Sequence, residues 1–341
     1  MRVLIFSLIF SFAFGQVTIA LNGTLPGQKT GNCISGRMNF NRSRIFALGG
    51  NEERRKLVDP GFYDWTYDNG RYKQDGDAIE LELVKNEIPG QLGANSRFSS
   101  TRLIKYGRIR AYMTPSSAPG VVSSFIMMSD IGQKASDEKG ELKDINDEID
   151  WEILGKDISR PQYNVFTYRS TRLELSGHGG PINTPVTPDV PHVFGIDWRH
   201  DRIDWSIDDE VVQTVYKAQS FSLTNSIPDG GPWFPTEPMR IQTSIWDGSN
   251  QASWAGVVDW NKSVFYQSRL DWVEVQCYDD DDNAVDSWPV NTPPPNTPSI
   301  GPKAKPKADL NLPGITLGNS AHAFNPRFSF ILISSLIVLT V

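Results

Sequence analysis

The chain has 341 residues with a formal net charge of −7, and 21% of its residues are charged. This acidic balance argues against a nucleic-acid-binding protein, which needs a basic surface. The length exceeds one average domain but suits a large β-sandwich, and ten Trp residues are more than core packing alone requires.

The N-terminus combines a short positively charged start with an apolar run over residues 3–14. That run is too short for a membrane span, which needs about 20 apolar residues. Small residues at 13–15 are typical of a signal-peptidase site, so we expect Gln16 to begin the mature chain, with cleavage after Ala20 as the alternative. We therefore predict a signal peptide within residues 1–20 and a secreted protein.

Short alternating segments separated by Gly, Pro and Asn turns dominate residues 31–278, and no long helical period or internal repeat is present. This pattern predicts an all-β domain, a sandwich of two antiparallel sheets, to which we assign residues 21–280. Glycosylation sequons, consistent with secretion, begin at Asn22, Asn41 and Asn261.

Acidic and apolar residues alternate strictly over residues 147–154. The alternation predicts a β-strand that places Glu148, Asp150 and Glu152 on one face and the apolar residues between them in the core. Two carboxyl groups on either side of a sugar bond are what a glycosidase uses. The Cα atoms of Glu148 and Glu152 would lie about 13 Å apart, so their side chains must lean together to reach the about 5 Å of a retaining enzyme.

These carboxylates allow two other interpretations. Alternating acids can be the solvated face of an edge strand, or they can bind calcium. Trp151, flanked by Ile149 and Ile153, favours a central, well-packed strand instead. We therefore favour catalysis, with mutual repulsion keeping one Glu ionised and the other protonated.

The segment 148–152 resembles the E-x-D-x-E signature of glycoside hydrolase family 16, the β-jelly-roll glucanases and transglycosylases. The resemblance extends over about residues 31–278 and is most specific at this signature. The strand before the signature, residues 121–130, resembles that of the fungal Crh branch, and further matching segments are 162–166, 192–198 and 203–208. The resemblance implies a β-jelly-roll fold.

The resemblance also implies roles for the matching residues. Glu148 would be the nucleophile, Glu152 the general acid/base, and Asp150 the residue that orients and tunes the nucleophile. The implied reaction is retaining, with a glycosyl-enzyme that is attacked by water or by a sugar hydroxyl. In the Crh branch chitin chains become grafted onto β-glucan, so we expect a β-linked glucan or chitin substrate. A hydrolytic endo-β-1,3(4)-glucanase is the alternative, and a catalytically silent wall-binding protein is a third possibility.

Four further residues are candidates for substrate binding. Trp246 and Trp254 resemble the sugar-platform segments of the family, although a Trp in a sandwich is commonly a core residue. Gln162 and Asn164 share one face of the strand after the signature. They would hydrogen-bond sugar hydroxyls there, or they would be ordinary polar side chains on the sheet surface.

Two features depart from the Crh pattern. Only Cys33 lies near the mature N-terminus, where that branch usually has a close cysteine pair, and a polar insertion occupies residues 131–146. The even cysteine count of a secreted chain predicts a Cys33–Cys277 disulfide, with two isolated thiols as the alternative. No C-x-x-C pair occurs and the histidines lack metal-ligand spacing, so we predict no metal or cofactor. The histidines are His178, His192, His200 and His322.

The composition changes after four consecutive Asp residues at 279–282. A Pro-rich stretch predicts an extended stalk over residues 281–318. The apolar end 328–341, with small residues at 318–321, predicts a GPI signal over 319–341, attached at Asn319 or, as second choice, Gly318. A plain tail anchor is the alternative. We therefore expect a monomer on the outer face of the plasma membrane or in the cell wall, with polysaccharide and membrane but not nucleic acid as partners.

Overall fold

The computed structural model describes residues 32–137, 139–170, 176–184, 186–218, 227 and 231–288. The predicted signal peptide, the GPI signal with Asn319, the sequon at Asn22 and most of the predicted stalk lie outside these residues. Asn41 and Asn261 lie in exposed turns. Within the described ranges, no helix is both long enough and apolar enough to cross a membrane.

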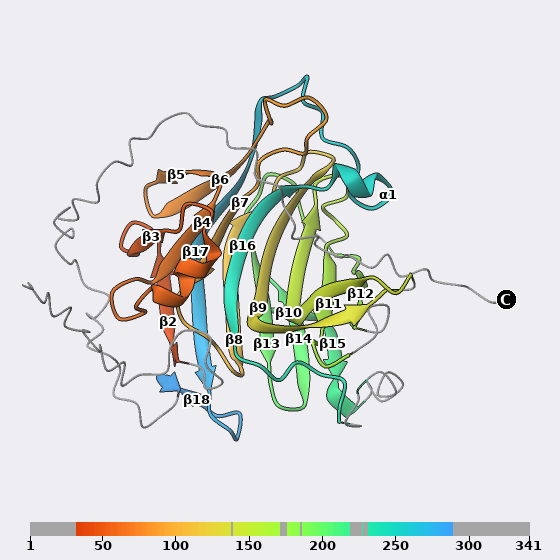
Figure 1. Cartoon of the computed structure of the whole chain (residues 1–341). Helices are drawn as coiled ribbons and strands as arrows, with labels where there is room; N and C mark the ends of the chain where they lie inside the picture. The colour runs from red at the N-terminus through yellow and green to blue at the C-terminus, as the bar shows by residue number, and fades with distance from the viewer. Residues whose placement is uncertain are drawn as a thin grey trace, which may run out of the picture.

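Two large sheets make up the fold, which confirms the predicted all-β sandwich (Figure 1). The first, which we call the site sheet, has eight strands in the order β12 (Gly177–Pro181), β11 (Gln162–Phe166), β10 (Leu142–Leu154), β9 (Val121–Ser136), β16 (Met239–Asp247), β7 (Ser96–Ser100), β4 (Trp65–Asn69) and β3 (Ile45–Ala47). Its strands pair antiparallel except β3 and β4, which are parallel.

The second sheet, the back sheet, has nine strands. Seven follow the order β15 (Glu210–Tyr216), β14 (Arg202–Ile207), β13 (His192–Trp198), β8 (Gly107–Thr114), β17 (Phe265–Tyr278), β6 (Ala78–Val84) and β5 (Arg71–Asp75), and β2 (Gly36–Asn39) and β18 (Ala284–Val285) pair with β17. A two-stranded sheet joins β1 (Cys33–Ile34) to β19 (Ser287–Trp288). The short helices are η1 (Glu52–Leu57), η4 (Ser249–Gln251) and α1 (Ala252–Ala255).

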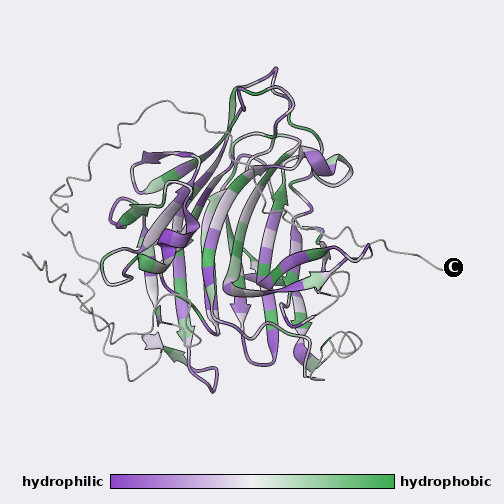
Figure 2. Cartoon of the chain, in the orientation of Figure 1, coloured by the Kyte–Doolittle hydropathy of each residue, from purple (hydrophilic) through white to green (hydrophobic). Residues whose placement is uncertain are grey.

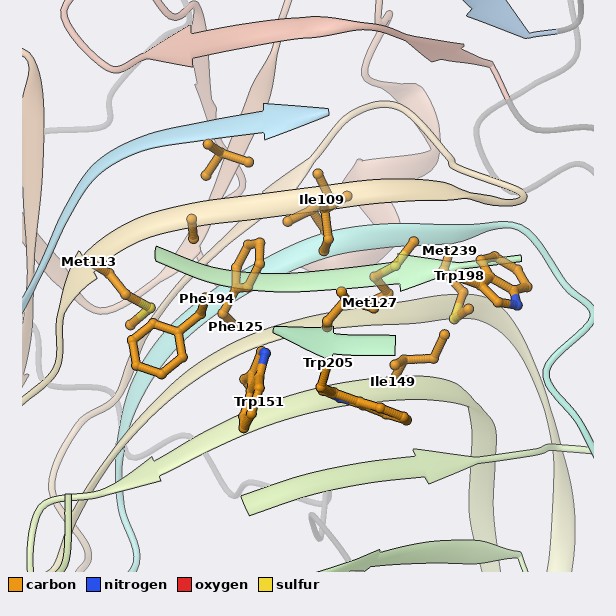
Figure 3. Packing of buried hydrophobic residues seen from close by; sticks show 14 of the residues in the cluster. Ile109, Met113, Phe125, Met127, Ile149, Trp151, Phe194, Trp198, Trp205 and Met239 are labelled. Atoms are coloured by element: carbon orange, nitrogen blue, oxygen red, sulfur yellow. The ribbon is translucent and has the colours of Figure 1, made fainter. Parts of the chain in front are cut away.

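The core lies between the sheets because their strands alternate buried and more exposed residues. Strand β8 follows this alternation along its whole length, and purple and green segments alternate along several strands in Figure 2. Large aromatic side chains from both sheets fill the space between them (Figure 3). Trp151 donates its indole N–H to Gly195 O at 2.9 Å, and Trp205 donates to Asp150 O at 2.9 Å. These two bonds fix the signature strand against the back sheet.

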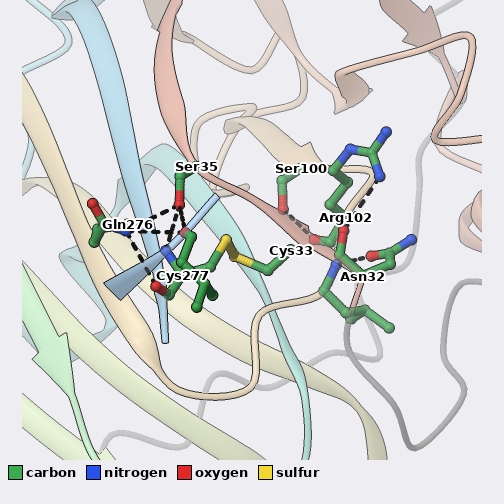
Figure 4. Close-up of a disulfide and its surroundings, with 9 residues drawn as sticks. Asn32, Cys33, Ser35, Ser100, Arg102, Gln276 and Cys277 are labelled. Carbon is green, nitrogen blue, oxygen red and sulfur yellow. Dashed lines mark hydrogen bonds between the residues drawn. A yellow bond between two sulfur atoms is a disulfide. The ribbon is translucent and has the colours of Figure 1, made fainter. Parts of the chain in front are cut away.

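A disulfide joins Cys33 to Cys277, as the cysteine count predicts (Figure 4). Beside it, Ser35 Oγ accepts from Cys277 N at 2.9 Å and donates to Val285 O at 2.6 Å. The fold continues past residue 280, where the sequence predicts the start of the stalk. Val285 and Trp288 pack against the core, so the described domain extends to Trp288.

The polar insertion before the signature is a β-hairpin that prolongs β9 and β10. The register between these strands shifts between Asn146 and Glu148, and pairing then resumes from Gly132–Asn146 to Ser136–Leu142. In Figure 1 the yellow hairpin turns away from the long strands and runs toward β12. Ala135 and Ile145 form a small apolar cluster with Tyr168, which anchors the hairpin.

Candidate active site

The three signature carboxylates lie on strand β10, which pairs with β9 on one side and β11 on the other. Ile149, Trp151 and Ile153 belong to the core, as the alternation predicts. Glu148, Asp150 and Glu152 therefore occupy the opposite, outer face of the site sheet. Asp150 and Glu152 are only 3% and 5% exposed, and Glu148 is half-buried. The solvated edge-strand interpretation is therefore wrong.

Burial dominates the electrostatics of these carboxylates. It raises the pKa of Glu148 to about 7, against a hydrogen bond from Asp150 and the positive charge of Arg97. Burial, and then the charge of Glu148, raises the pKa of Glu152 to about 8. Asp150 has a pKa well above its ordinary value because it is buried between two acids. Near neutral pH these environments favour an ionised Glu148 beside a protonated Glu152.

The two amides of β11 behave differently although they share one face. Asn164 lies opposite Asp150 and Gln162 opposite Glu152 in the strand register. The Asn164 Nδ2 donates to Glu152 Oε2 at 3.4 Å, a long contact that places this amide at the acid. Gln162 instead donates to Arg160 O at 3.0 Å. Of the two predicted amides, the structure therefore brings only Asn164 into contact with the carboxylates.

The two predicted platform residues contact each other. Trp246 at the end of β16 and Trp254 in α1 stack with ring centroids 5.8 Å apart and an interplanar angle of 25°. They belong to a small apolar cluster separate from the main core. The Trp246 indole N–H donates to Ser124 Oγ at 3.0 Å, and Ser124 lies opposite Glu152 in the register. The pair therefore lies toward the Glu152 end of the carboxylate row.

Asp147, the first residue of the signature segment, has a role that the sequence reasoning missed. Its carboxylate is fully buried and accepts three backbone N–H bonds, from Tyr168 at 3.0 Å, Thr236 at 2.5 Å and Glu237 at 2.8 Å. Burial raises its pKa to about 6, against these bonds. Its own N–H donates to Ser129 Oγ at 3.0 Å. An Asp directly before E-x-D-x-E was the available signal.

A network of charges that the sequence reasoning also missed connects strands β4 and β7 of the site sheet to the short helix η1. Buried Asp68 accepts from Arg55 at 2.8 Å and from Arg97 Nε at 2.9 Å. The charge of Arg97 lowers the pKa of Glu148, so the network affects the signature. Its members come from distant segments, so no local motif could reveal it. The network also includes Thr66 and Ser99, which donate to Asp68 at 2.6 Å each.

The calcium interpretation is not supported by the described part of the chain. No group of three or more His, Cys, Asp or Glu residues there is arranged to hold a metal ion.

Comparison with known proteins identifies the relatives of this chain. The family model of the glycosyl hydrolases family 16 matches residues 61–262. Crh-like protein 2 of Aspergillus fumigatus is 30% identical over 237 residues, which cover 65% of this chain and 47% of that protein. Congo red hypersensitive protein 2 of Saccharomyces cerevisiae is 27% identical over 229 residues, covering 63% and 43%. The chain thus spans about half the length of these curated relatives.

A solved structure with the same fold is a Crh5 transglycosylase in complex with NAG. It superposes with a TM-score of 0.50 at 22% identity, covering 76% of this chain and 89% of that one. The likeness agrees with the jelly-roll sandwich described above.

Proposed function

Because the chain belongs to glycosyl hydrolase family 16, we propose that it is a retaining transglycosylase acting on β-linked cell-wall polysaccharide, either β-glucan or chitin. The observation that carries the proposal is the row of three carboxylates on one face of β10, in which the charge of Arg97 opposes the pKa rise at Glu148 and the charge of Glu148 adds to the pKa rise at Glu152. This difference supports one ionised and one protonated group, which is the division of roles that retaining chemistry needs.

The proposed reaction has two steps. The Glu148 carboxylate attacks the anomeric carbon while the glycosidic C–O bond breaks, and the departing oxygen takes the proton of Glu152. Glu152, now ionised, then accepts the proton of an acceptor hydroxyl whose oxygen attacks the same carbon, and Glu148 leaves as a carboxylate. A protonated Asp150 donates a hydrogen bond to Glu148 and so orients it, and the core bonds of Trp151 and Trp205 hold the strand in place.

Transfer to a sugar is favoured over transfer to water by the relatives that the chain matches, which are Crh-like proteins and a Crh5 transglycosylase. A hydrolytic endo-β-1,3(4)-glucanase has the same first step and differs only in the acceptor. A silent wall-binding protein has no reason to keep three crowded, buried carboxylates. We also propose secretion, which the Cys33–Cys277 disulfide supports because disulfides persist in oxidising compartments. GPI anchoring at the cell surface is proposed from the sequence of residues 318–341.

The test is to incubate the secreted protein with β-glucan or chitin and labelled oligosaccharide acceptors, and to follow both transfer and new reducing ends. NMR of the first-formed product should show the β-anomer, because a covalent intermediate retains configuration. The Glu148→Gln variant should form no product with any substrate. An initial α-anomer, or normal turnover in Glu148→Gln, would refute the nucleophile role.

A further inference from the structure

The start of the signature strand is held to two loops by one side chain. Strand β11 ends opposite Glu148, with Phe166 in register with it, and Tyr168 follows two residues later. Thr236 and Glu237 belong to the segment that leads into β16. The backbone N–H groups of Tyr168, Thr236 and Glu237 all point at the Asp147 carboxylate, within 2.5–3.0 Å. Asp147 thus joins three segments that are far apart in sequence.

The two loops are also joined to each other and to the hairpin. Tyr168 Oη donates to Glu237 Oε1 at 3.1 Å, so the residues that Asp147 holds by their backbones pair through their side chains. The ring of Tyr168 packs on Ala135 and Ile145 of the hairpin. Gln133 of the hairpin donates to Ser170 O at 2.9 Å in the same loop. Each of these contacts connects, through Tyr168 or its loop, to the Asp147 carboxylate and so to the backbone next to Glu148.

The Asp147 carboxylate is fully buried, so its charge has to be balanced by hydrogen-bond donors. Ionised, it needs donors for both oxygens, and it has them: Tyr168 N donates to Oδ1, and Thr236 N and Glu237 N to Oδ2. Such charge-assisted bonds are short and directional, which fixes backbone positions more closely than apolar packing does. The neighbouring Glu148 is the residue whose position the proposed reaction depends on most, since small displacements of a reacting group cost much rate.

From this arrangement we propose that Asp147 is a positioning residue that fixes the backbone of Glu148 and holds Tyr168 and Glu237 as one wall of the active site. The inference rests on the proposed function, because it assigns Glu148 the attacking role. Asp147 is fully buried at the register shift of β10 and is assigned no contact with substrate. It acts through the three backbone groups that it accepts from and through the main chain that it shares with Glu148.

The experiment compares the Asp147→Asn and Ser129→Ala variants with wild type on a short aryl β-glycoside donor, well below the lowest melting temperature. Asparagine turns an N–H donor toward at least one of the three backbone N–H groups, so kcat should fall about 10- to 100-fold while KM changes less than about threefold. Ser129→Ala removes the acceptor of the Asp147 backbone N–H and should give a smaller loss of kcat in the same direction. Asp144→Asn is the matched control, because Asp144 is exposed on the hairpin and paired with Lys134.

Hydrogen exchange of the full protein supplies a readout that does not depend on catalysis. The amides of Tyr168, Thr236 and Glu237 should exchange faster in Asp147→Asn and remain unchanged in Asp144→Asn. A lower melting temperature with unchanged kcat in both variants, or unchanged exchange at these amides, overturns the inference. Absence of a glycosyl-enzyme in the wild type would instead contradict the proposed function, and the exchange experiment would still report on the Asp147 clamp.

Discussion

The three carboxylates of the site owe their properties to where the strand places them. Successive residues of one strand face lie about 7 Å apart, so the ionised forms repel one another, and burial disfavours every charge further. Glu148 is the least buried of the three and has a positive charge nearby in Arg97. Glu152 lacks that compensation and feels the charge of Glu148. These surroundings favour loss of the proton from Glu148 before Glu152 as the pH rises.

The first prediction concerns the pH dependence of kcat/KM. In the proposed reaction Glu148 must be ionised to attack, so activity should rise with pH through about 7. Glu152 must be protonated to act as the acid, so activity should fall above about 8. The profile is therefore a bell with its maximum between these values. Stopped assays across the pH range on an oligosaccharide donor, whose poor leaving group needs the acid, will measure it.

The Glu152→Gln variant identifies the groups behind the two limbs. A neutral amide cannot lose a proton, so the alkaline limb should disappear and the acid limb should remain. Turnover should fall about 10²- to 10⁴-fold with a poor leaving group and much less for glycosyl-enzyme formation with a good one. Complete loss of turnover in this variant, also with a good leaving group, would show that the two roles are exchanged.

At the scale of single residues, the sequence predicts which face of a strand a side chain occupies better than it predicts which atoms that side chain contacts. Strict alternation was enough to place Ile149, Trp151 and Ile153 in the core. The same period put Gln162 and Asn164 on one face, yet only Asn164 turns its amide to Glu152, while Gln162 bonds to Arg160 O. Side-chain rotamers depend on neighbours from other segments, and a period along one strand does not contain them.

At the scale of elements, the hairpin of residues 132–146 distinguishes this molecule. The sequence shows it only as a polar insertion, because most of its residues are polar or charged. Its two residues that pack on Tyr168, Ala135 and Ile145, give no recognisable apolar pattern. The network around Asp68 was hidden for a similar reason, since β4, β7 and η1 each supply one or two charges. Both the hairpin cluster and the network around Asp68 depend on contacts between segments that are far apart in sequence, and a local sequence pattern does not contain these contacts.

The second prediction is that the hairpin limits water at the site. Gly132 and Asn146 lie opposite one another, so a two-residue Asn-Gly turn can replace residues 133–145 and still close the strands. Removal uncovers Tyr168, and the glycosyl-enzyme should then react with water more often. The ratio of transfer to hydrolysis, measured with labelled acceptor and reducing-end assays, should fall several-fold.

The control for the hairpin deletion is the Lys134→Gln substitution, which removes the exposed ion pair with Asp144 and leaves the hairpin in place. It should keep the wild-type ratio. An unchanged ratio in the deletion variant, with the fold intact by circular dichroism, would show that the hairpin plays no part in excluding water.

For the whole molecule, the same buried acids link function to stability. Asp147, Glu148, Asp150 and Glu152 all have raised pKa values in the folded protein. In the unfolded chain these groups titrate near pH 4. Between about pH 5 and 8 the folded state therefore binds more protons than the unfolded state, and its stability falls as pH rises. The Cys33–Cys277 disulfide and the hydrophobic core offset this loss of folding stability, which comes from the buried acids that the proposed reaction uses.

The third prediction follows from this linkage. The melting temperature should be higher at pH 5 than at pH 8, since stability is lost as pH rises through the folded pKa values of about 6, 7 and 8 for Asp147, Glu148 and Glu152. The Glu152→Gln variant lacks one buried charge, so it should melt higher than wild type at pH 8 and close to it at pH 5. A difference of one unit between the folded and unfolded pKa of a group is worth about 1.4 kcal/mol, or about 3–6 °C in the melting temperature of a domain of this size. Differential scanning calorimetry of both proteins from pH 5 to 8 measures the slopes. Parallel slopes would mean that Glu152 titrates alike in the folded and unfolded states, and the proposed acid would then lack the environment that holds its proton.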